Sequence, residues 1–230
     1  MQLHCDASGL EWNVAAYLSQ DETAIQEIIN EFDLHSDNQQ RFGLPNRRDA
    51  KVFLFRLIYG GSAWSYAYDP DFNWISRDPD FWQRLIDETY RKYPGLRKWH
   101  DDLESSVRRL GYYESVSGRV YKFKPYQKRG VWVWPRTTIL NYPVQGLGAD
   151  IMMLVRISLA RRMREKQYKS LLVNTIHDSI DVDTVPEEWY NISMDMKSVF
   201  EDLPANFEKM FGVPYNVPLR CKITLDGVEQ

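Results

Sequence analysis

Cysteine is nearly absent from this sequence, which has two cysteines in 230 residues. Cys5 and Cys221 form no CxxC pair, so the sequence offers no disulfide framework and is typical of a reducing compartment. Long apolar runs are missing too, since the best candidate for a membrane span, residues 151–159, contains Arg156 and follows Asp150. The N-terminus lacks the basic and apolar segments of a secretory signal. These absences predict a cytoplasmic protein with no membrane partner.

An excess of positive charge is also lacking, because the formal net charge is −3. That balance by itself argues against a nucleic-acid-binding protein. The distribution of charge indicates the opposite. Residues 91–136 contain twelve basic and four acidic residues, a local charge of +8, with Tyr and Trp among them, whereas eleven acidic residues face four basic ones from Asp178 onward. A basic middle with aromatic rings suits a phosphate backbone, although a solvated helix surface has a similar composition.

The apolar pattern predicts strands and helices that interleave without a regular βαβ rhythm, which favours the α+β class. Strands are expected at residues 3–5, 171–176, 180–182 and 217–225, and residues 112–123 are expected to form a hairpin. Helices are expected at residues 11–18, 21–32, 47–59, 80–93, 96–110 and 189–211. Residues 33–46 are polar and rich in turn formers. A long helix over residues 138–166 is expected to break near Tyr142-Pro143.

Two aspartates stand at the ends of predicted apolar strands. Asp6 begins the segment Asp6-Ala7-Ser8-Gly9-Leu10-Glu11, and Asp178 lies within His177-Asp178-Ser179 at the tip of a predicted hairpin. On adjacent strands, such aspartates could hold two Mg²⁺ ions, which prefer oxygen ligands and could stabilise the attacking and leaving oxygens of a phosphoryl transfer. Taken alone, Asp6 also fits a helix cap and Asp178 a turn residue.

The predicted helix 47–59 carries a stripe of residues spaced four apart: Arg47, Lys51, Phe55 and Tyr59. Cations near a helix N-terminus oppose the helix dipole, and an incoming triphosphate would resolve that conflict. The rings that follow could stack on a base. An amphipathic helix with an apolar core face and solvated cations remains an alternative.

These segments resemble motifs A, B and C of the family A (polymerase I-like) DNA polymerases, in the same order. Motif A of the family, Asp-Tyr-Ser-Gln-Ile-Glu, is kept at Asp6, Ser8 and Glu11. Motif B is kept at Arg47, Arg48, Ala50, Lys51, Phe55, Tyr59 and Gly60, and motif C at His177 and Asp178. Residues 141–146 and 149–151, Asp33-Leu34-His35 and residues 91–95 also have counterparts in the family, so the similarity covers nearly the whole chain.

The resemblance implies template-directed DNA synthesis, in which a primer 3′-hydroxyl attacks the α-phosphate of a dNTP and pyrophosphate leaves. It implies that two Mg²⁺ ions bind Asp6 and Asp178 and that Arg47 and Lys51 hold the triphosphate. Phe55 would pack on the sugar and base, and Glu11 would exclude a 2′-hydroxyl. Tyr59 would lie near the templating base, and primer–template DNA would be contacted by Asn141, Gln145, His177 and Arg136.

The resemblance also implies a palm, with a small antiparallel sheet backed by helices, at residues 1–18 and 136–230. Mainly helical fingers would occupy residues 19–135. In the family, the thumb and any exonuclease domain precede motif A. We therefore expect either a truncated fragment or one chain of a split polymerase, for example from a phage, acting in a bacterial or phage-infected host cytoplasm. A thumb-bearing second chain or N-terminal region would complete it.

Four positions depart from the family pattern, and two other functions remain open. Gly9 replaces a glutamine, Arg56 a glycine, Thr137 an arginine that commonly touches the primer–template, and Ser179 an acidic residue. One alternative is a non-catalytic DNA-binding or assembly subunit, against which the retained Asp6 and Asp178 argue. The other is a metal-dependent nuclease, which needs no triphosphate-binding helix.

Overall fold

The structure is a computed structural model that describes residues 1–229, and the chain divides into two compact units. Unit 1 comprises Met1–Val14 and Gln145–Gln230, and unit 2 comprises Ala15–Val144. Helices occur together with antiparallel sheets, so the predicted α+β class is confirmed. No helix among the described residues combines the length and apolar character that a membrane crossing requires.

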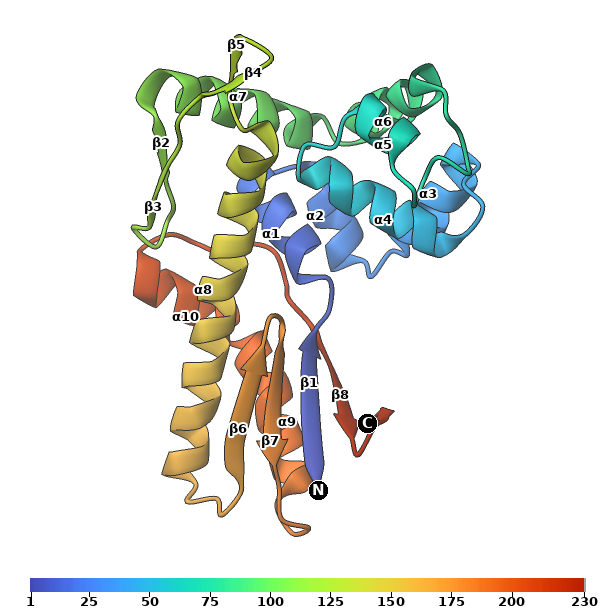
Figure 1. The fold of residues 1–230 in the computed structure, drawn as a ribbon. Helices are drawn as coiled ribbons and strands as arrows, with labels where there is room; N and C mark the ends of the chain where they lie inside the picture. Colours follow the sequence, from blue (N-terminus) through green and yellow to red (C-terminus); the bar gives the residue numbers. More distant parts are fainter. Residues whose placement is uncertain (230) are drawn as a thin grey trace. The chain divides into compact units, whose positions relative to one another are not determined.

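Unit 1 is built on an antiparallel sheet with the strand order β6 (Leu171–Ile176), β7 (Ser179–Asp183), β1 (Gln2–Ala7), β8 (Cys221–Leu225) and β9 (Val228–Glu229). Side chains of β1 alternate: Leu3, Cys5 and Ala7 are buried, while His4 and Asp6 are only half-buried on the opposite face. Helix α9 (Trp189–Glu201) packs against β1 and β8, behind the sheet in Figure 1, and α10 (Leu203–Phe211) follows it. The alternation therefore leaves Asp6 on the polar face of the sheet.

Helix α8 (Arg136–Glu165) continues through Pro143, so the expected break near Tyr142-Pro143 is wrong. A proline inside a helix removes one backbone hydrogen bond and costs about 3 kcal/mol. Ile139, Leu140, Val144 and Leu147 around it are all at most 1% exposed. Burying each such side chain contributes about 1.5–3 kcal/mol, which together exceeds the cost of the proline.

Unit 2 is mainly helical and has an aromatic core. Phe53, Tyr66 and Phe72 surround the fully buried Trp82, with ring centroids 5.3–6.1 Å from its indole. The polar atoms of the core are bonded, since Trp82 Nε1 donates to the Ser76 carbonyl at 2.9 Å and the Tyr66 hydroxyl to that of Phe53 at 2.9 Å. The helices that lie wholly within this unit are α2 (Glu22–Ile29), α3 (Leu34–Phe42), α4 (Arg47–Ile58), α5 (Ala63–Tyr68), α6 (Pro79–Lys92) and α7 (Pro94–Leu110).

Helix α3 lies where a turn-rich loop was expected, and that expectation is wrong. Its buried positions are Leu34, Asn38 and Phe42, which follow a regular spacing of four. Because Asn38 is polar, the apolar periodicity is concealed in the sequence. The Asp33 carboxylate accepts the Ser36 N–H at 3.2 Å to begin the helix, and Gly43 ends it in the left-handed conformation, with φ 63°.

Two short hairpins follow α7. The first, β2 (Tyr112–Glu114) and β3 (Val120–Lys122), falls within the predicted hairpin at residues 112–123. The second, β4 (Tyr126–Lys128) and β5 (Val131–Val133), was not predicted. Its two-residue turn, Arg129-Gly130, has φ values of 51° and 80°, the left-handed pair that matches the twist of a tight hairpin.

The Asp21 carboxylate caps two helices at once. It is buried and accepts N–H groups from Ala24 at 3.0 Å, Gly95 at 2.7 Å and Leu96 at 3.3 Å, in the first turns of α2 and α7. We expect Asp21→Ala to lower the free energy of unfolding of the chain by about 2–4 kcal/mol, because buried N–H groups lose their acceptor. Urea denaturation measures this loss.

A matched control for this change is Asp78→Ala. The Asp78 carboxylate also begins a helix, α6, but it is exposed and accepts a single N–H, from Asp80 at 2.9 Å. We expect a loss of about 1 kcal/mol there. Equal losses in the two variants would contradict the double cap.

Candidate active site

Asp6 and Asp178 lie on neighbouring backbone segments at one end of the unit 1 sheet. Asp6 pairs in register with Ser179, and the Ala7 N–H donates to the Asp178 carbonyl at 2.8 Å. Asp178 belongs to the tight turn between β6 and β7, where His177 is exposed and adopts a left-handed φ of 50°. The structure thus brings the two sequence-predicted aspartates together, along with His177.

The donor set fits a particular kind of metal site. Within residues 1–229, no three His, Cys, Asp or Glu side chains gather closely enough to hold a metal ion. Mg²⁺ commonly binds one or two protein carboxylates and completes its shell with water and substrate phosphates. Asp6 and Asp178 suit such an ion. Ser179 has no carboxylate to offer a metal. Its hydroxyl instead donates to the Ile176 carbonyl at 3.0 Å and closes the turn.

The turn after Asp6 explains the glycine that replaces the family's glutamine. Gly9 has φ 64°, a left-handed conformation that a glutamine side chain would disfavour. The Asn13 amide donates to the carbonyls of Ser8 at 3.3 Å and Gly9 at 3.1 Å, so this turn is fixed by the first residues of α1 (Leu10–Ser19). The tight turn leads directly from Asp6 into the helix.

Glu11 stands in the first turn of α1, where it meets another predicted site residue. The Gln145 amide, on α8, donates to Glu11 Oε1 at 3.5 Å. Both residues belong to unit 1, as Asp6 and Asp178 do. Unit 1 therefore contains the predicted site residues Asp6, Glu11, Gln145 and Asp178.

A histidine–aspartate pair beside Asp6 was missed by the sequence analysis. His4 Nδ1 lies 2.7 Å from Asp181 Oδ1, and Asp181 is only 5% exposed. The two residues face each other across β1 and β7, two positions from Asp6 and Ser179 on the same face. The available signal was the polar alternation in Ile180-Asp181-Val182-Asp183, but the partner depends on strand register.

In unit 2, the predicted stripe runs along α4. Arg47 and Lys51 are exposed, Phe55 is half-buried, and Tyr59 is the half-buried C-cap. The Arg47 guanidinium binds the Asp33 carboxylate through Nε at 3.2 Å and Nη2 at 3.0 Å, and these bonds hold the pKa of Asp33 well below its usual range. Asp33 thus compensates one of the two cations at the helix start.

Lys51 has no such acid. Its Nζ lies 5.6 Å from the centroid of the Phe55 ring, and no carboxylate pairs with it in the described part of the chain. His35 of α3, to which the sequence analysis gave no role, also lies near Phe55, with ring centroids 6.1 Å apart. Burial, then the charges of Arg47 and Lys51, lower the pKa of His35 to about 4, so this imidazole is neutral at pH 7.

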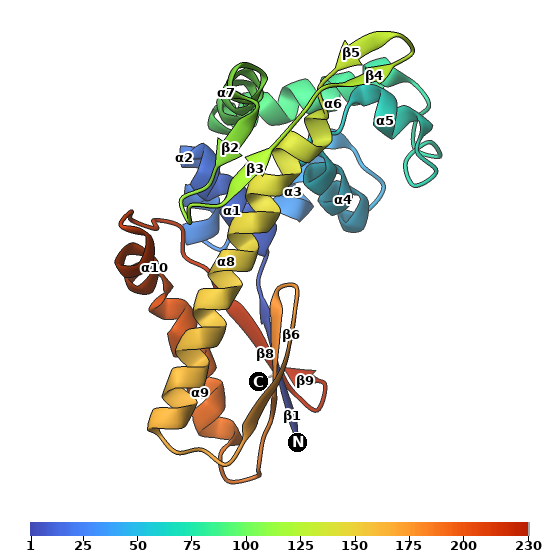
Figure 2. The ribbon, with the colours of Figure 1, turned by 60° about the vertical axis from the view of Figure 1, so that its left-hand side comes forward.

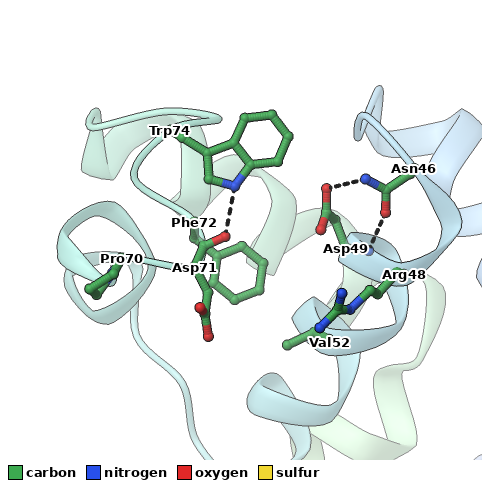
Figure 3. Close-up of a pocket in the computed structure, with 8 residues that line it drawn as sticks. All are labelled: Asn46, Arg48, Asp49, Val52, Pro70, Asp71, Phe72 and Trp74. Atoms are coloured by element: carbon green, nitrogen blue, oxygen red, sulfur yellow. Dashed lines mark hydrogen bonds between the residues drawn. The ribbon is translucent and has the colours of Figure 1, made fainter.

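Arg56, which replaces the family's glycine, ties α4 to the segment that follows α5. Its guanidinium pairs with Asp69 at 2.5 Å and Asp71 at 2.9 Å and lies 4.8 Å from the centroid of the Phe72 ring. Between these elements is a pocket of about 390 Å³, with Trp74 and Asp71 on one side and Arg48 and Val52 of α4 on the other (Figure 3). Its lining includes no residue of the stripe.

The residues near the start of α8 that were predicted to contact DNA differ in burial and in hydrogen bonding. The Arg136 guanidinium donates to Glu104 at 2.6 Å and to the Gly60 carbonyl at 2.9 Å, so it holds elements of unit 2 together. Asn141 is half-buried one turn before the exposed Gln145. A contact between Arg136 and DNA remains a prediction, alongside this internal role.

The chain is similar to proteins of a known family. DNA polymerase family A matches residues 1–226. DNA polymerase I of Lactococcus lactis subsp. cremoris is 29% identical over 211 residues, which are 87% of this chain and 24% of that protein. The thermostable DNA polymerase I of Thermus aquaticus is 27% identical over 228 residues, or 95% and 26%. The chain spans about a quarter of the length of these relatives.

A solved structure is similar in fold. The POL domain of Pol1 from M. smegmatis, in complex with DNA primer-template and dNTP, aligns with a TM-score of 0.79 at 20% identity, over 96% of this chain and 38% of that one. At this identity the likeness concerns the fold. Because the family match covers nearly every residue, the chain belongs to DNA polymerase family A.

Proposed function

We propose that this chain is the palm and fingers part of a polymerase that transfers a dNTP to a primer 3′-hydroxyl under the direction of a template. The observation that carries the proposal is the backbone contact between the Asp6 and Asp178 segments, in a chain that family A matches over residues 1–226. Mg²⁺ bound there would neutralise charge on the attacking and leaving oxygens. Family membership and the polar sheet face support this chemistry over a passive binding subunit.

The residues of the chain would position the reactants. Lys51, exposed and without a carboxylate partner, and Arg47 would bind the triphosphate; Phe55 would pack on the sugar and base. Glu11, held by Gln145, would exclude a 2′-hydroxyl. Tyr59 would lie near the templating base. The primer–template would be contacted by Asn141, Gln145, His177 and Arg136.

The same proposal assigns the palm to residues 1–18 and 136–230 and the fingers to residues 19–135. The structure divides nearby, between Val14 and Ala15 and between Val144 and Gln145. The M. smegmatis domain was solved with primer-template DNA and dNTP, and we propose both as substrates here. A thumb-bearing segment, in a second chain or in an N-terminal region, would complete the enzyme.

Template-directed incorporation tests this proposal. The chain is combined with a thumb-bearing segment of a family A polymerase, and a labelled primer is extended on templates that each call for a different first nucleotide. We expect incorporation of the complementary dNTP alone. Shortening of the primer would instead identify a nuclease, and DNA binding without incorporation would identify a non-catalytic subunit.

Lys51→Ala should raise the KM for dNTP in that assembly by about 10- to 150-fold, because a charge-assisted bond to phosphate contributes about 1.5–3 kcal/mol. Arg48→Ala is the matched control. Arg48 is also an exposed cation of the first turn of α4, but it lines the pocket in Figure 3 rather than the stripe. Steady-state kinetics of single-nucleotide insertion measure both. An equal rise in KM in the two variants would attribute the effect to the loss of positive charge in general and would contradict a specific role of Lys51.

Phe55→Tyr should increase the incorporation of dideoxynucleotides relative to deoxynucleotides. The added hydroxyl would sit where a 3′-hydroxyl normally lies, if the Phe55 ring packs against the sugar. Competition between labelled ddNTP and dNTP gives the ratio. Trp74→Phe is the control, because it changes an exposed aromatic residue outside the stripe. Phe53→Tyr is unsuitable because Phe53 is fully buried. An unchanged ratio in Phe55→Tyr would reject the role.

A further inference from the structure

The β4–β5 hairpin lies in a stretch of the chain that has no acidic residue. Between Glu114 and Asp150 the sequence contains six cations and neither Asp nor Glu. Lys128 and Arg129 stand at the tip of the hairpin, and both are exposed. Among the described residues, no carboxylate forms an ion pair with either of them. The negative charges of a phosphate backbone could pair with these two cations.

Aromatic and apolar side chains on the same hairpin are left open to solvent. Trp132 is 65% exposed, Val131 63% and Tyr126 48%. Within residues 1–229, neither the Trp132 nor the Tyr126 ring takes part in a ring contact or a side-chain hydrogen bond. Both views show the turn of this hairpin at the outer edge of unit 2 (Figure 1 and Figure 2). Exposed rings of this size are not explained by folding.

The register of the hairpin places a ring on each of its faces. Gln127 pairs with Trp132, and Lys128 pairs with Val131. Because side chains alternate along a strand, Trp132 and Gln127 share one face, while Tyr126 and Lys128 share the other. Each face therefore combines a ring with a polar or charged side chain. Trp132 and Lys128 therefore lie on opposite faces, and Arg129 stands at the turn between the two strands. A flexible ligand that offers both flat apolar faces and phosphates could meet the ring and the cations across this tip.

We propose that the β4–β5 hairpin binds single-stranded DNA, with Trp132 stacking on a base and Lys128 and Arg129 contacting phosphates. A single strand exposes the faces of its bases, whereas a duplex hides them in its stack, so the open rings favour the single strand. The inference rests on the proposed function for its role, since a template has a single-stranded part. Its test does not, because binding requires no catalysis.

Binding of a fluorescent oligothymidine to the whole chain at low salt, followed by anisotropy, tests the proposal. We expect Trp132→Ala to weaken binding at least about fivefold, because base–aromatic stacking contributes about 1–3 kcal/mol. Trp132→Phe keeps a ring and should retain most of the affinity. Trp74→Ala removes a tryptophan that is 60% exposed elsewhere in unit 2, and it should change nothing.

The charged tip is tested through the salt dependence. Lys128→Gln combined with Arg129→Asn keeps a side chain that tolerates the left-handed turn. It should reduce the slope of log affinity against log salt by about 1.4, or 0.7 for each phosphate contact. Thermal unfolding checks that every variant is folded. The binding assay contains no dNTP and measures no nucleotide transfer, which separates this proposal from failure of catalysis.

Two outcomes would overturn the proposal. One is wild-type affinity for oligothymidine in folded Trp132→Ala. The other is an equal loss of affinity for a blunt duplex of the same length in Trp132→Ala, because stacking on an open base cannot explain it.

Discussion

Replacing Asp178 with asparagine is expected to lower the rate of primer extension by about 10²- to 10³-fold in the completed assembly. Asparagine has nearly the same shape as aspartate but no negative charge, so it holds Mg²⁺ poorly while preserving the turn between β6 and β7. The backbone contact from Ala7 to the Asp178 carbonyl does not depend on the side chain. We expect Asp6→Asn to behave in the same way.

Asp183→Asn is the matched control for this loss. Asp183 is on β7, on the same face as Asp181, and its side chain is 71% exposed. Removing its charge should leave extension within about twofold of the unchanged protein, since it lies at the far end of the strand. Single-turnover extension measures the rates, and thermal unfolding shows whether the fold is intact. Near-normal extension by folded Asp178→Asn would refute the metal role.

The second large effect concerns the 230-residue chain by itself. We expect it to extend a primer weakly, and to gain activity by two orders of magnitude or more when a thumb-bearing polymerase segment is added. Accurate positioning of reactants contributes about 7–11 kcal/mol in well-oriented reactions, and a loosely held primer forfeits much of it. The net charge of −3 gives the chain little general attraction for DNA.

The activity of the chain alone should also fall as the salt concentration rises. Fewer phosphate contacts mean weaker binding, which falls further as ions compete for the phosphates. Extension is therefore compared at low and physiological salt, with and without the added segment, and with an unrelated DNA-binding protein as control. Processive extension by the chain alone at physiological salt would refute the need for a partner.

The sequence predicted those parts of the site that depend on local pattern. Asp6 and Asp178 were placed at strand ends, and the structure joins the two segments by a hydrogen bond from the Ala7 N–H to the Asp178 carbonyl. Arg47 and Lys51 were placed on one side of a helix, which the structure forms over Arg47–Ile58. The pairs His4–Asp181 and Arg47–Asp33 could not be predicted. Each requires knowledge of which distant segments become neighbours.

The errors in the fold have different physical origins. Helix α3 was missed because the buried Asn38 interrupts its apolar spacing, although Asp33 and Gly43 supplied the capping signals. The break assigned to Pro143 overvalued one lost hydrogen bond against the burial of its neighbours. The β4–β5 hairpin was missed because its side chains are exposed on both faces, so no alternation marks it.

The position of β1 in its sheet also determines the order in which the chain can fold. β1 pairs on one side with β7 and on the other with β8, so Leu3 faces both Val182 and Leu225. Unit 2 is continuous in the sequence, from Ala15 to Val144, so it can fold while the rest of the chain is still being synthesised. The strand that carries Asp6 must wait for β7 and β8, which follow unit 2 in the chain and emerge several seconds later at roughly 5–20 residues per second. Until β7 emerges, both hydrogen-bonding edges of β1 are uncovered, and the second edge stays open until β8 follows. An unpaired strand edge can pair with another chain, so the nascent protein is exposed to aggregation during this interval.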